Sequence, residues 1–421
     1  MLKAKYSKNG IIFLCTLAYF ASYFSRKTFS VVMVNMLDTD VLTKEVAGLV
    51  GTALFIFYGA GQLLSGYLGD KLQPKNLMFS GLMISAICNL LLPLMPNGYF
   101  MIPIWAVNGF AQALLWPPIV RILSDNLTHE KYVSANLVVT CGAHVSTIVL
   151  YLYAPLCISI MSWKLVFFTS TVFCIVAGFI FILAMSLVLP KNAEIKEITS
   201  VKSEKTHEKA EESSTSIFQI FIRNGVLPIF VCIIAMGFMR DGIESWLPTL
   251  YSDVFEQTSE NSILVSVALP IFSIISLFAV RAIHKGKVFN NEVRGAGILF
   301  GLSIVLCIPL CFLINVNNSA CRIICLLLAC IVCAFMHSCN FLLISCVPGR
   351  FKKTGRASTV SGCCNACTYI GAAVSMYGIA LISDNLGWSA TIISWIGICI
   401  LGVVFAILAF KKYTGFLKSD K

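Results

Sequence analysis

The chain has 421 residues, of which 58% are hydrophobic and only 12% are charged. A soluble domain is roughly 45–50% apolar and about 25% charged, so this composition excludes an ordinary soluble protein and predicts an all-α membrane protein. A net charge of +11 would suit a nucleic-acid partner, but the basic residues lie in short loops between apolar runs. That placement favours membrane topology as the cause of the charge.

Twelve apolar runs are long enough to cross a bilayer as helices. The first six are expected near 11–36, 46–69, 76–95, 100–123, 133–157 and 164–189, and the second six near 221–250, 261–282, 294–315, 320–346, 355–382 and 388–410. Residues 190–216 alternate lysine with glutamate, which is typical of a solvated linker. We therefore expect two pseudo-symmetric six-helix bundles, over 1–189 and 217–421, joined by a cytoplasmic linker over 190–216.

The loops alternate between rich and poor in lysine and arginine, and such residues in short loops stay in the cytoplasm. The rich loops carry Lys71 and Lys75, Arg121 and Lys131, the linker, Arg281 with Arg294, and Arg350 with Arg356. We therefore expect a multi-pass protein of the cell (plasma or inner) membrane with both termini in the cytoplasm. Its surroundings are then the lipid bilayer, with no nucleic-acid partner, and we expect a single chain to be functional.

Two arginines lie inside predicted spans, where an unpaired charge costs roughly 2.5–3.5 kcal/mol even on insertion scales. Arg26 shares a helical face with Tyr23 in the first span, and Arg240 lies 214 residues later in the seventh. Their separation is about half of 421 residues, so the two side chains occupy equivalent heights in two repeated halves. Two guanidinium forks facing one cavity would suit a tetrahedral oxyanion. The alternative is that each arginine reaches the membrane surface or pairs with a nearby acid, such as Asp241 or Glu244 beside Arg240.

Other polar side chains inside the spans are weaker candidates for a substrate-binding cavity. His144 lies in the fifth span on a face with Tyr151, and its imidazole could bind substrate or take part in proton coupling. Further candidates on other spans are Tyr58, Gln62, Asn108, Gln112, Trp116, His337, Asn340, Asn365 and Tyr369. For each of them a hydrogen bond between helices is the alternative role.

The 18 cysteines are spread through apolar segments, without the paired spacing of a disulfide framework. Cys364 and Cys367 form a CxxC pair on a helix rich in small residues, which favours close helix packing. The sequence has no phosphate-binding glycine loop, no nucleophile elbow and no metal-ligand spacing. We therefore expect no catalytic residue, no cofactor and no metal, and we do not expect an enzyme.

Several motifs resemble those of one transporter family. Gly66-Tyr-Leu-Gly-Asp70-Lys71-Leu-Gln-Pro-Lys75 is similar to the gating loop of the major facilitator superfamily. The stretch Arg240-Asp-Gly-Ile-Glu-Ser-Trp-Leu-Pro-Thr249 resembles that of its organophosphate:phosphate antiporters. Tyr23-x-x-Arg26-Lys27-x-Phe29, Asn108-Gly109-x-x-Gln112-x-x-x-Trp116-Pro117-Pro118-x-x-Arg121, Ala143-His144, Phe351-Lys352-Lys353-x-Gly355 and Gly387-Trp388 resemble further parts of the same family.

The resemblance implies the major facilitator fold and alternating access by rocking of two bundles. It places the family's two binding arginines on Arg26 and Arg240 and its cavity histidine on His144, and it implies a charge-paired gate at Asp70, Lys71, Lys75 and Arg121. This chain departs from the family at Gln62, where some glycerol-phosphate carriers have lysine, and in the acids Asp241 and Glu244 near Arg240.

Three functions follow as hypotheses. The first is a secondary transporter of a small organic anion that exchanges a phosphate ester for inorganic phosphate. The second is a proton-coupled symporter of a carboxylate or other organic anion, in which Glu244, Asp241 or His144 carries the proton. The third is a membrane sensor of a sugar phosphate, since the resembled family contains such a receptor.

Overall fold

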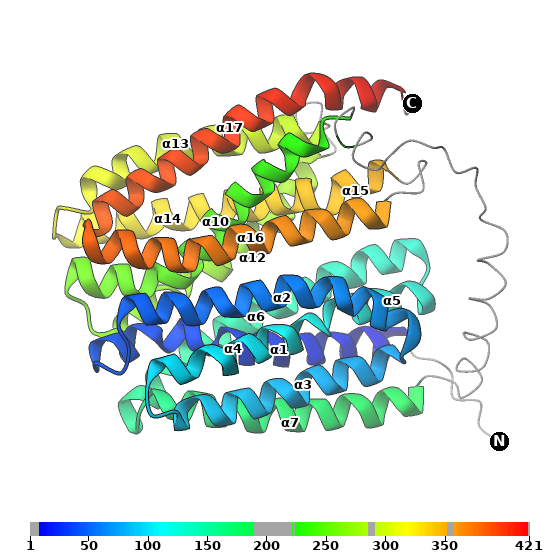
Figure 1. Cartoon of the computed structure of the whole chain (residues 1–421), viewed down its shortest axis with the longest axis horizontal. Helices are drawn as coiled ribbons and strands as arrows, with labels where there is room; N and C mark the ends of the chain where they lie inside the picture. The colour runs from blue at the N-terminus through cyan, green and yellow to red at the C-terminus, as the bar shows by residue number, and fades with distance from the viewer. Residues whose placement is uncertain (1–7, 189–220, 222–223, 285–290, 352–356, 420–421) are drawn as a thin grey trace.

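All regular secondary structure in the described part of the chain is helical. The computed structural model describes residues 8–188, 221, 224–284, 291–351 and 357–419, and its helices run along the longest axis of the molecule (Figure 1). Within these ranges, ten helical segments are long and apolar enough to cross a membrane. The long helices α1 (Lys8–Asp38) and α2 (Lys44–Lys71) run beside them. The predicted fold of twelve spanning segments is confirmed.

The first bundle forms the lower half of Figure 1. Besides α1 and α2 it contains α3 (Pro74–Leu91) with the 3-10 turn Leu92–Leu94, α4 (Gly98–Ala113), α5 (Trp116–Asn126), α6 (His129–Ile160) and α7 (Trp163–Val188). The fourth predicted span is a broken helix, because α4 ends before Leu114 and α5 starts at Trp116. Pro117 and Pro118 cannot donate the backbone hydrogen bonds of a continuing helix, but they fit its first turn.

The second bundle forms the upper half of Figure 1. It contains α10 (Val226–Phe255), α11 (Ser259–Val265), α12 (Ala268–His284), α13 (Glu292–Leu313), α14 (Ser319–Asn340), a π-helical segment (Phe341–Cys346), α15 (Val347–Arg350), α16 (Ala357–Asn385) and α17 (Gly387–Ser419). The eighth predicted span is thus divided into α11 and α12. The predicted linker over 190–216 lies outside the described residues.

The two ends of the molecule differ in charge. We call the end where α1 begins and α17 ends the basic end; it lies to the right in Figure 1. The opposite end, where α1 ends and α17 begins, is the acidic end. Basic residues at the basic end include Lys75, Arg121, Arg281, Arg294 and Arg350, and acids at the acidic end include Asp38, Glu45, Asp253, Glu260 and Asp384.

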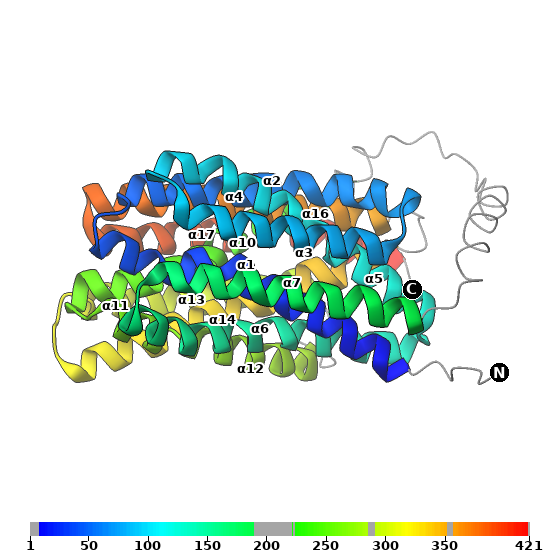
Figure 2. The same cartoon turned by 90° about the horizontal axis from the view of Figure 1, so that it is seen from below.

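The bundles meet along two sides of their interface. On one side α2 packs against α16, and on the other α6 packs against α11 and α12, as the two perpendicular views also show (Figures 1 and 2). Between these contacts α1 of the first bundle lies against α10 of the second. Arg26 and Arg240 lie on these two central helices, so the fold brings both to the middle of the interface.

Glycines let α10 and α16 approach closely inside the second bundle. A Cβ atom added at Gly371 would collide with the backbone carbonyl of Ile234, and one added at Gly237 would collide with that of Thr368. Backbone atoms cannot rotate away as a flexible side chain can, so these two helices depend on the absence of side chains there.

We therefore expect Gly371→Ala to destabilise the protein by about 1–3 kcal/mol through overpacking, although alanine is by about 0.5–1 kcal/mol the better helix former. The matched control is Gly301→Ala on α13, where an added Cβ meets nothing within 4 Å. Thermal unfolding of the purified protein in detergent measures both. A melting temperature for Gly371→Ala at or above that of Gly301→Ala would contradict the packing argument.

Candidate functional site

Arg26 is buried against aromatic rings. It is 5% exposed, and its guanidinium carbon lies 4.5 Å from the ring centroid of Tyr58, 5.3 Å from that of Tyr23 and 5.8 Å from that of Phe55. Within the described part of the chain, no carboxylate lies within 4.0 Å of this guanidinium. Aromatic faces attract the cation but form no ion pair with it, so Arg26 has no directly paired carboxylate in the described part of the chain, and its charge is left for a bound anion.

Arg240 differs from Arg26 in having polar partners. One of its terminal nitrogens donates to Asn340 Oδ1 at 2.8 Å, and the other donates to Asp241 Oδ2 at 2.6 Å. Pairing with a neighbouring acid is therefore realised at Arg240 and not at Arg26. Asn340 is the last residue of α14, directly before the π-helical segment Phe341–Cys346, and such segments are frequent at functional sites.

The two arginines belong to one electrostatic group across the interface. Arg26 interacts electrostatically with Asp241, the partner of Arg240. Tyr369 on α16 interacts with both arginines, and its ring centroid lies 4.3 Å from that of Tyr58. We call Arg26, Arg240, Tyr58, Tyr369 and Asn340 the arginine site.

A second group of charged residues lies beside the arginine site. Lys27 Nζ on α1 lies 2.6 Å from Glu244 Oε2 on α10, and the other carboxylate oxygen lies 2.7 Å from His337 Nε2 on α14. The hydroxyl of Tyr151 donates to the backbone carbonyl of Glu244 at 3.2 Å. His144 on α6 lies edge to face with His337, with ring centroids 5.1 Å apart. The structure thus places His144, Tyr151 and Glu244 in one inter-bundle cluster.

Sequence reasoning noted Lys27 only as a neighbour of Arg26. Its side chain is 9% exposed, and its ammonium joins the two bundles through Glu244. The sequence feature that could have identified Lys27 is its position directly after Arg26 in an apolar helix, because a second buried charge there also needs a partner.

Several predicted residues lie elsewhere. Asn108 and Gln112 point into the first bundle, where they are hydrogen-bonded to the hydroxyl groups of Ser85, Ser22 and Ser25, so they hold helices together. Gln62 and Trp116 contact their own bundle: the Gln62 amide donates to the carbonyl of Ala113, and the Trp116 ring packs on Tyr19. Asn365 is half-buried on α16, four residues before Tyr369.

The predicted gate at the basic end is described only in part. Arg121 pairs with Asp125 one turn later on α5, at 3.7 Å, and Lys75 lies in the first turn of α3. Asp70 and Lys71 are the last residues of α2, and their side chains lie outside the described part of the structure. The gating role of these four residues stays a prediction.

The bundles are joined at the acidic end. Asn35 donates to the Ser259 hydroxyl at 3.0 Å, and Lys44 Nζ lies 2.7 Å from Asp253 Oδ2. The hydrogen bonds of Asn35, Thr52, Tyr151 and Ser252 and the ion pairs of Lys27 and Lys44 that join the two bundles lie in the half that runs from Lys27 to the acidic end.

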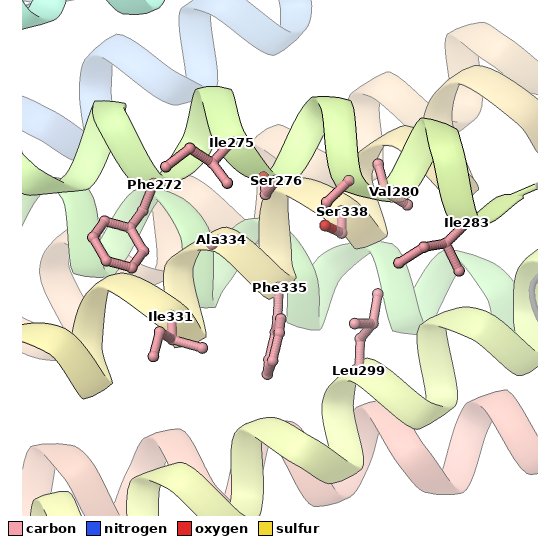
Figure 3. A pocket seen from close by; sticks show the side chains of 11 residues that line it. Phe272, Ile275, Ser276, Val280, Ile283, Leu299, Ile331, Ala334, Phe335 and Ser338 are labelled. Atoms are coloured by element: carbon pink, nitrogen blue, oxygen red, sulfur yellow. The ribbon is translucent and has the colours of Figure 1, made fainter.

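An apolar cavity of about 240 Å³ lies within the second bundle, between α12, α13 and α14 (Figure 3). Its lining is mostly aliphatic and aromatic, and its polar side-chain atoms are the hydroxyl groups of Ser276 and Ser338. A cavity without a charged group offers an anion no compensation for its lost hydration, so the arginine site remains the candidate.

Comparison with known proteins agrees with the fold. Residues 15–374 match the sequence profile of the Major Facilitator Superfamily. A "Probable hexose phosphate transport protein" of Chlamydia muridarum (strain MoPn / Nigg) is 22% identical, covering 95% of this chain and 90% of its own length. The "Glycerol-3-phosphate transporter" of Bacillus subtilis (strain 168) is 24% identical, covering 94% and 90%. A solved structure of a bacterial homologue of the human lysosomal transporter Spinster, inward-facing and occupied, matches with a TM-score of 0.74 at 14% identity over 99% of each chain.

Proposed function

Since this chain belongs to the major facilitator superfamily, we propose that it is a secondary transporter that exchanges a phosphate ester for inorganic phosphate by alternating access. The observation that carries the proposal is Arg26, a buried guanidinium that lies against aromatic rings and has no carboxylate partner in the described part of the chain. Its relatives named for hexose phosphate and glycerol 3-phosphate support the same substrate class.

The arginine site suits a phosphate group. A guanidinium donates two parallel hydrogen bonds to a phosphate edge, and Arg26 and Arg240 approach the site from different bundles. Phosphate bound to Arg26 supplies the direct ion-pair partner that this side chain lacks among the described residues. The bound phosphate also competes with Asp241 for the N–H donors of Arg240. Binding therefore replaces the ion pair between Arg240 and Asp241, within one bundle, by ion pairs of phosphate with the arginines of both bundles. The hydroxyl groups of Tyr58 and Tyr369 are further donors, since the Tyr58 ring lies beside Arg26 and the Tyr369 ring beside Tyr58.

We propose that the basic end faces the cytoplasm. We also propose that the transporter adopts its inward-facing conformation in this structure. The charge difference between the ends supports the orientation, because lysine and arginine concentrate in cytoplasmic loops. The contacts of Asn35 with Ser259 and of Lys44 with Asp253 close the outer side. In this arrangement both termini are cytoplasmic, and one chain in the cell membrane is sufficient for transport.

Exchange is tested in vesicles reconstituted with the purified protein and loaded with phosphate. We expect labelled phosphate or glucose 6-phosphate outside to enter only when phosphate or an ester is present inside. Protein-free vesicles are the control. Absence of labelled phosphate uptake under every loading condition would remove the exchange mechanism.

Proton-coupled symport is the second candidate, favoured by the buried group Lys27, Glu244 and His337. We expect Glu244→Gln to keep phosphate exchange independent of the pH gradient if the protein is an antiporter, because exchange requires no proton carrier. If it is a symporter, the same change removes proton-driven uptake, since an amide does not titrate. Uptake with and without an inward proton gradient distinguishes the two. Wild-type uptake that collapses with the gradient would favour symport.

A further inference from the structure

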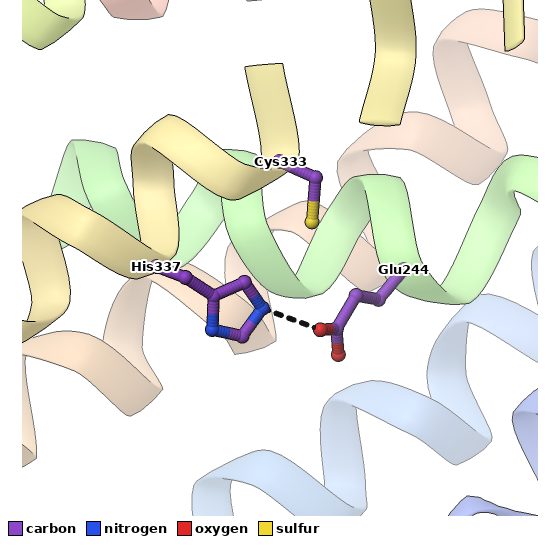
Figure 4. Close-up of side chains that lie close together, drawn as sticks. All are labelled: Glu244, Cys333 and His337. Atoms are coloured by element: carbon purple, nitrogen blue, oxygen red, sulfur yellow. Dashed lines mark hydrogen bonds and ion pairs between the residues drawn. The ribbon is translucent and has the colours of Figure 1, made fainter. Parts of the chain in front are cut away.

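Glu244, Cys333 and His337 lie close together (Figure 4), and Glu244 follows Arg240 of the arginine site by about one turn on α10. Cys333 and His337 are four residues apart on α14, so they share one face of that helix. Glu244 approaches from α10. One ligand atom from each of the three lies within 4.8 Å of the others. We propose that these residues bind a divalent cation of the zinc class, with His144 of the opposite bundle as the fourth ligand, and that the bound ion fastens the two bundles together.

The three side chains are those that zinc prefers. Thiolate sulfur, imidazole nitrogen and carboxylate oxygen bind Zn²⁺ at about 2.0–2.3 Å in a tetrahedron, so their mutual separations in a bound site are about 3.3–3.6 Å. His337 Nε2 and Glu244 Oε1 lie 2.7 Å apart, and Cys333 Sγ lies within 4.8 Å of both, so reaching these separations takes shifts of about one ångström or less. A thiol and an imidazole disfavour Mg²⁺ and Ca²⁺, which take oxygen ligands.

Because the cluster is buried, it can select among metal ions, unlike a chance grouping of ligand side chains on the surface. Cys333 is fully buried, His337 is 8% exposed, and the Glu244 side chain is 14% exposed. A cation there is shielded from water on most sides, so ligand identity decides the affinity. The exposed part of Glu244 leaves one side open for an ion to enter.

Charge balance at the cluster is set by Lys27. Its ammonium holds Glu244 Oε2, whereas the cation takes the place of the hydrogen bond between Oε1 and His337. Cys333 transfers its proton to solvent as the metal–sulfur bond forms, and His337 binds as a neutral imidazole. The cluster thereby gains one positive charge, the difference between the cation and the released proton. Lys27 opposes this gain, so its removal strengthens binding.

His144 connects the cluster to the other bundle. Its ring lies edge to face with His337, with centroids 5.1 Å apart, and it belongs to α6 whereas the other ligands belong to α10 and α14. The group of ligand atoms that lie within 4.8 Å of one another does not include His144, so binding the ion requires the His144 imidazole to rotate toward it. A cation held by both bundles at mid-height opposes their relative motion, and zinc then inhibits transport.

The test uses metal-free purified protein in detergent, with Co²⁺ as the spectroscopic probe and Zn²⁺ in isothermal titration. We expect one Co²⁺ per chain with a thiolate-to-metal charge-transfer band, and loss of that band in Cys333→Ser with at least about a 100-fold weaker Zn²⁺ affinity. The matched control is Cys325→Ser, a buried cysteine two turns away on the same helix. Equal bands and affinities in the two variants would overturn the site.

Two further variants test the remaining parts. Lys27→Met is expected to bind Zn²⁺ more tightly than the wild type, which a merely structural cysteine would not explain. His144→Gln is expected to weaken Zn²⁺ binding about 10-fold or more, and an unchanged affinity would overturn the contribution of the opposite bundle. Since none of these measurements needs transport, their failure would leave the proposed exchange untouched.

Discussion

Arg26→Lys is expected to raise the Kd for a phosphate ester at least about 30-fold. Lysine keeps the charge but loses the planar fork, so it cannot form two parallel hydrogen bonds to one phosphate edge. Impairing a buried, hydrogen-bonded charge pair costs about 2–5 kcal/mol, and 2 kcal/mol is about 30-fold in Kd. The aromatic rings of Tyr23, Phe55 and Tyr58 fit a flat guanidinium better than a hydrated ammonium, which adds to the loss.

Binding is measured by isothermal titration of glucose 6-phosphate, glycerol 3-phosphate and inorganic phosphate into purified protein. The matched control is Arg294→Lys, which makes the same change at an exposed position on α13 near the basic end. We expect that variant to bind like the wild type. A Kd for Arg26→Lys within about threefold of the control corresponds to a difference in binding free energy of less than about 1 kcal/mol. That result would mean that the Arg26 guanidinium does not bind the anion.

The variant Arg240→Lys distinguishes the role of Arg240 from that of Arg26. Because Arg240 is held by Asn340 and Asp241, its replacement also leaves a buried carboxylate less well compensated. We expect weaker binding together with a lower melting temperature without ligand. Arg26→Lys, by contrast, should leave the melting temperature nearly unchanged, since lysine keeps the charge and no described carboxylate forms an ion pair with Arg26.

The architecture was predictable because the bilayer restricts the possible structures. A chain that crosses lipid must satisfy its backbone hydrogen bonds within helices, so apolar length and loop charge were enough to predict twelve spans. The repeat of the two halves also predicted that Arg26 and Arg240 lie on corresponding helices, and they lie on α1 and α10, the central helices of the two bundles. Their surroundings did not follow, because the sequence alone does not tell which face of α2 or α16 meets Arg26.

The contacts between distant helices were beyond sequence reasoning for a physical reason. Lys27 and Glu244 are 217 residues apart, and Glu244 and His337 are 93 apart. No local periodicity relates such pairs, and the helical patterns of α1, α10 and α14 specify only that each polar face needs partners. Asn108 and Gln112 illustrate the same limit: their positions fitted either a cavity or a helix contact, and the structure places them in the latter.

The acidic end offers the strongest test of alternating access. If the closure there must open in every cycle, a covalent bond across it stops transport. Asn35 and Ser259 are short side chains in contact, with Nδ2 and Oγ 3.0 Å apart, and they lie on α1 and α11 of different bundles. A disulfide requires Cβ atoms about 3.5–4.5 Å apart, which short contacting side chains approach.

We expect the double variant Asn35→Cys with Ser259→Cys to lose phosphate exchange after oxidation, down to the level of protein-free vesicles, and to regain it after reduction. Peptide mass spectrometry measures the cross-linked fraction, and labelled phosphate uptake measures exchange. Each single variant, oxidised in the same way, controls for the 18 native cysteines, all of which are free.

Substrate binding distinguishes a protein held closed by the disulfide from a protein that has lost its native structure. The oxidised double variant should still bind phosphate ester from the basic end, because the bond lies away from the arginine site. Loss of exchange with binding intact means that the acidic end must open for the anion to cross. If the fully cross-linked double variant exchanged phosphate at the wild-type rate, the anion would pass without separation of residues 35 and 259. Rocking of the two bundles would then not be the transport mechanism.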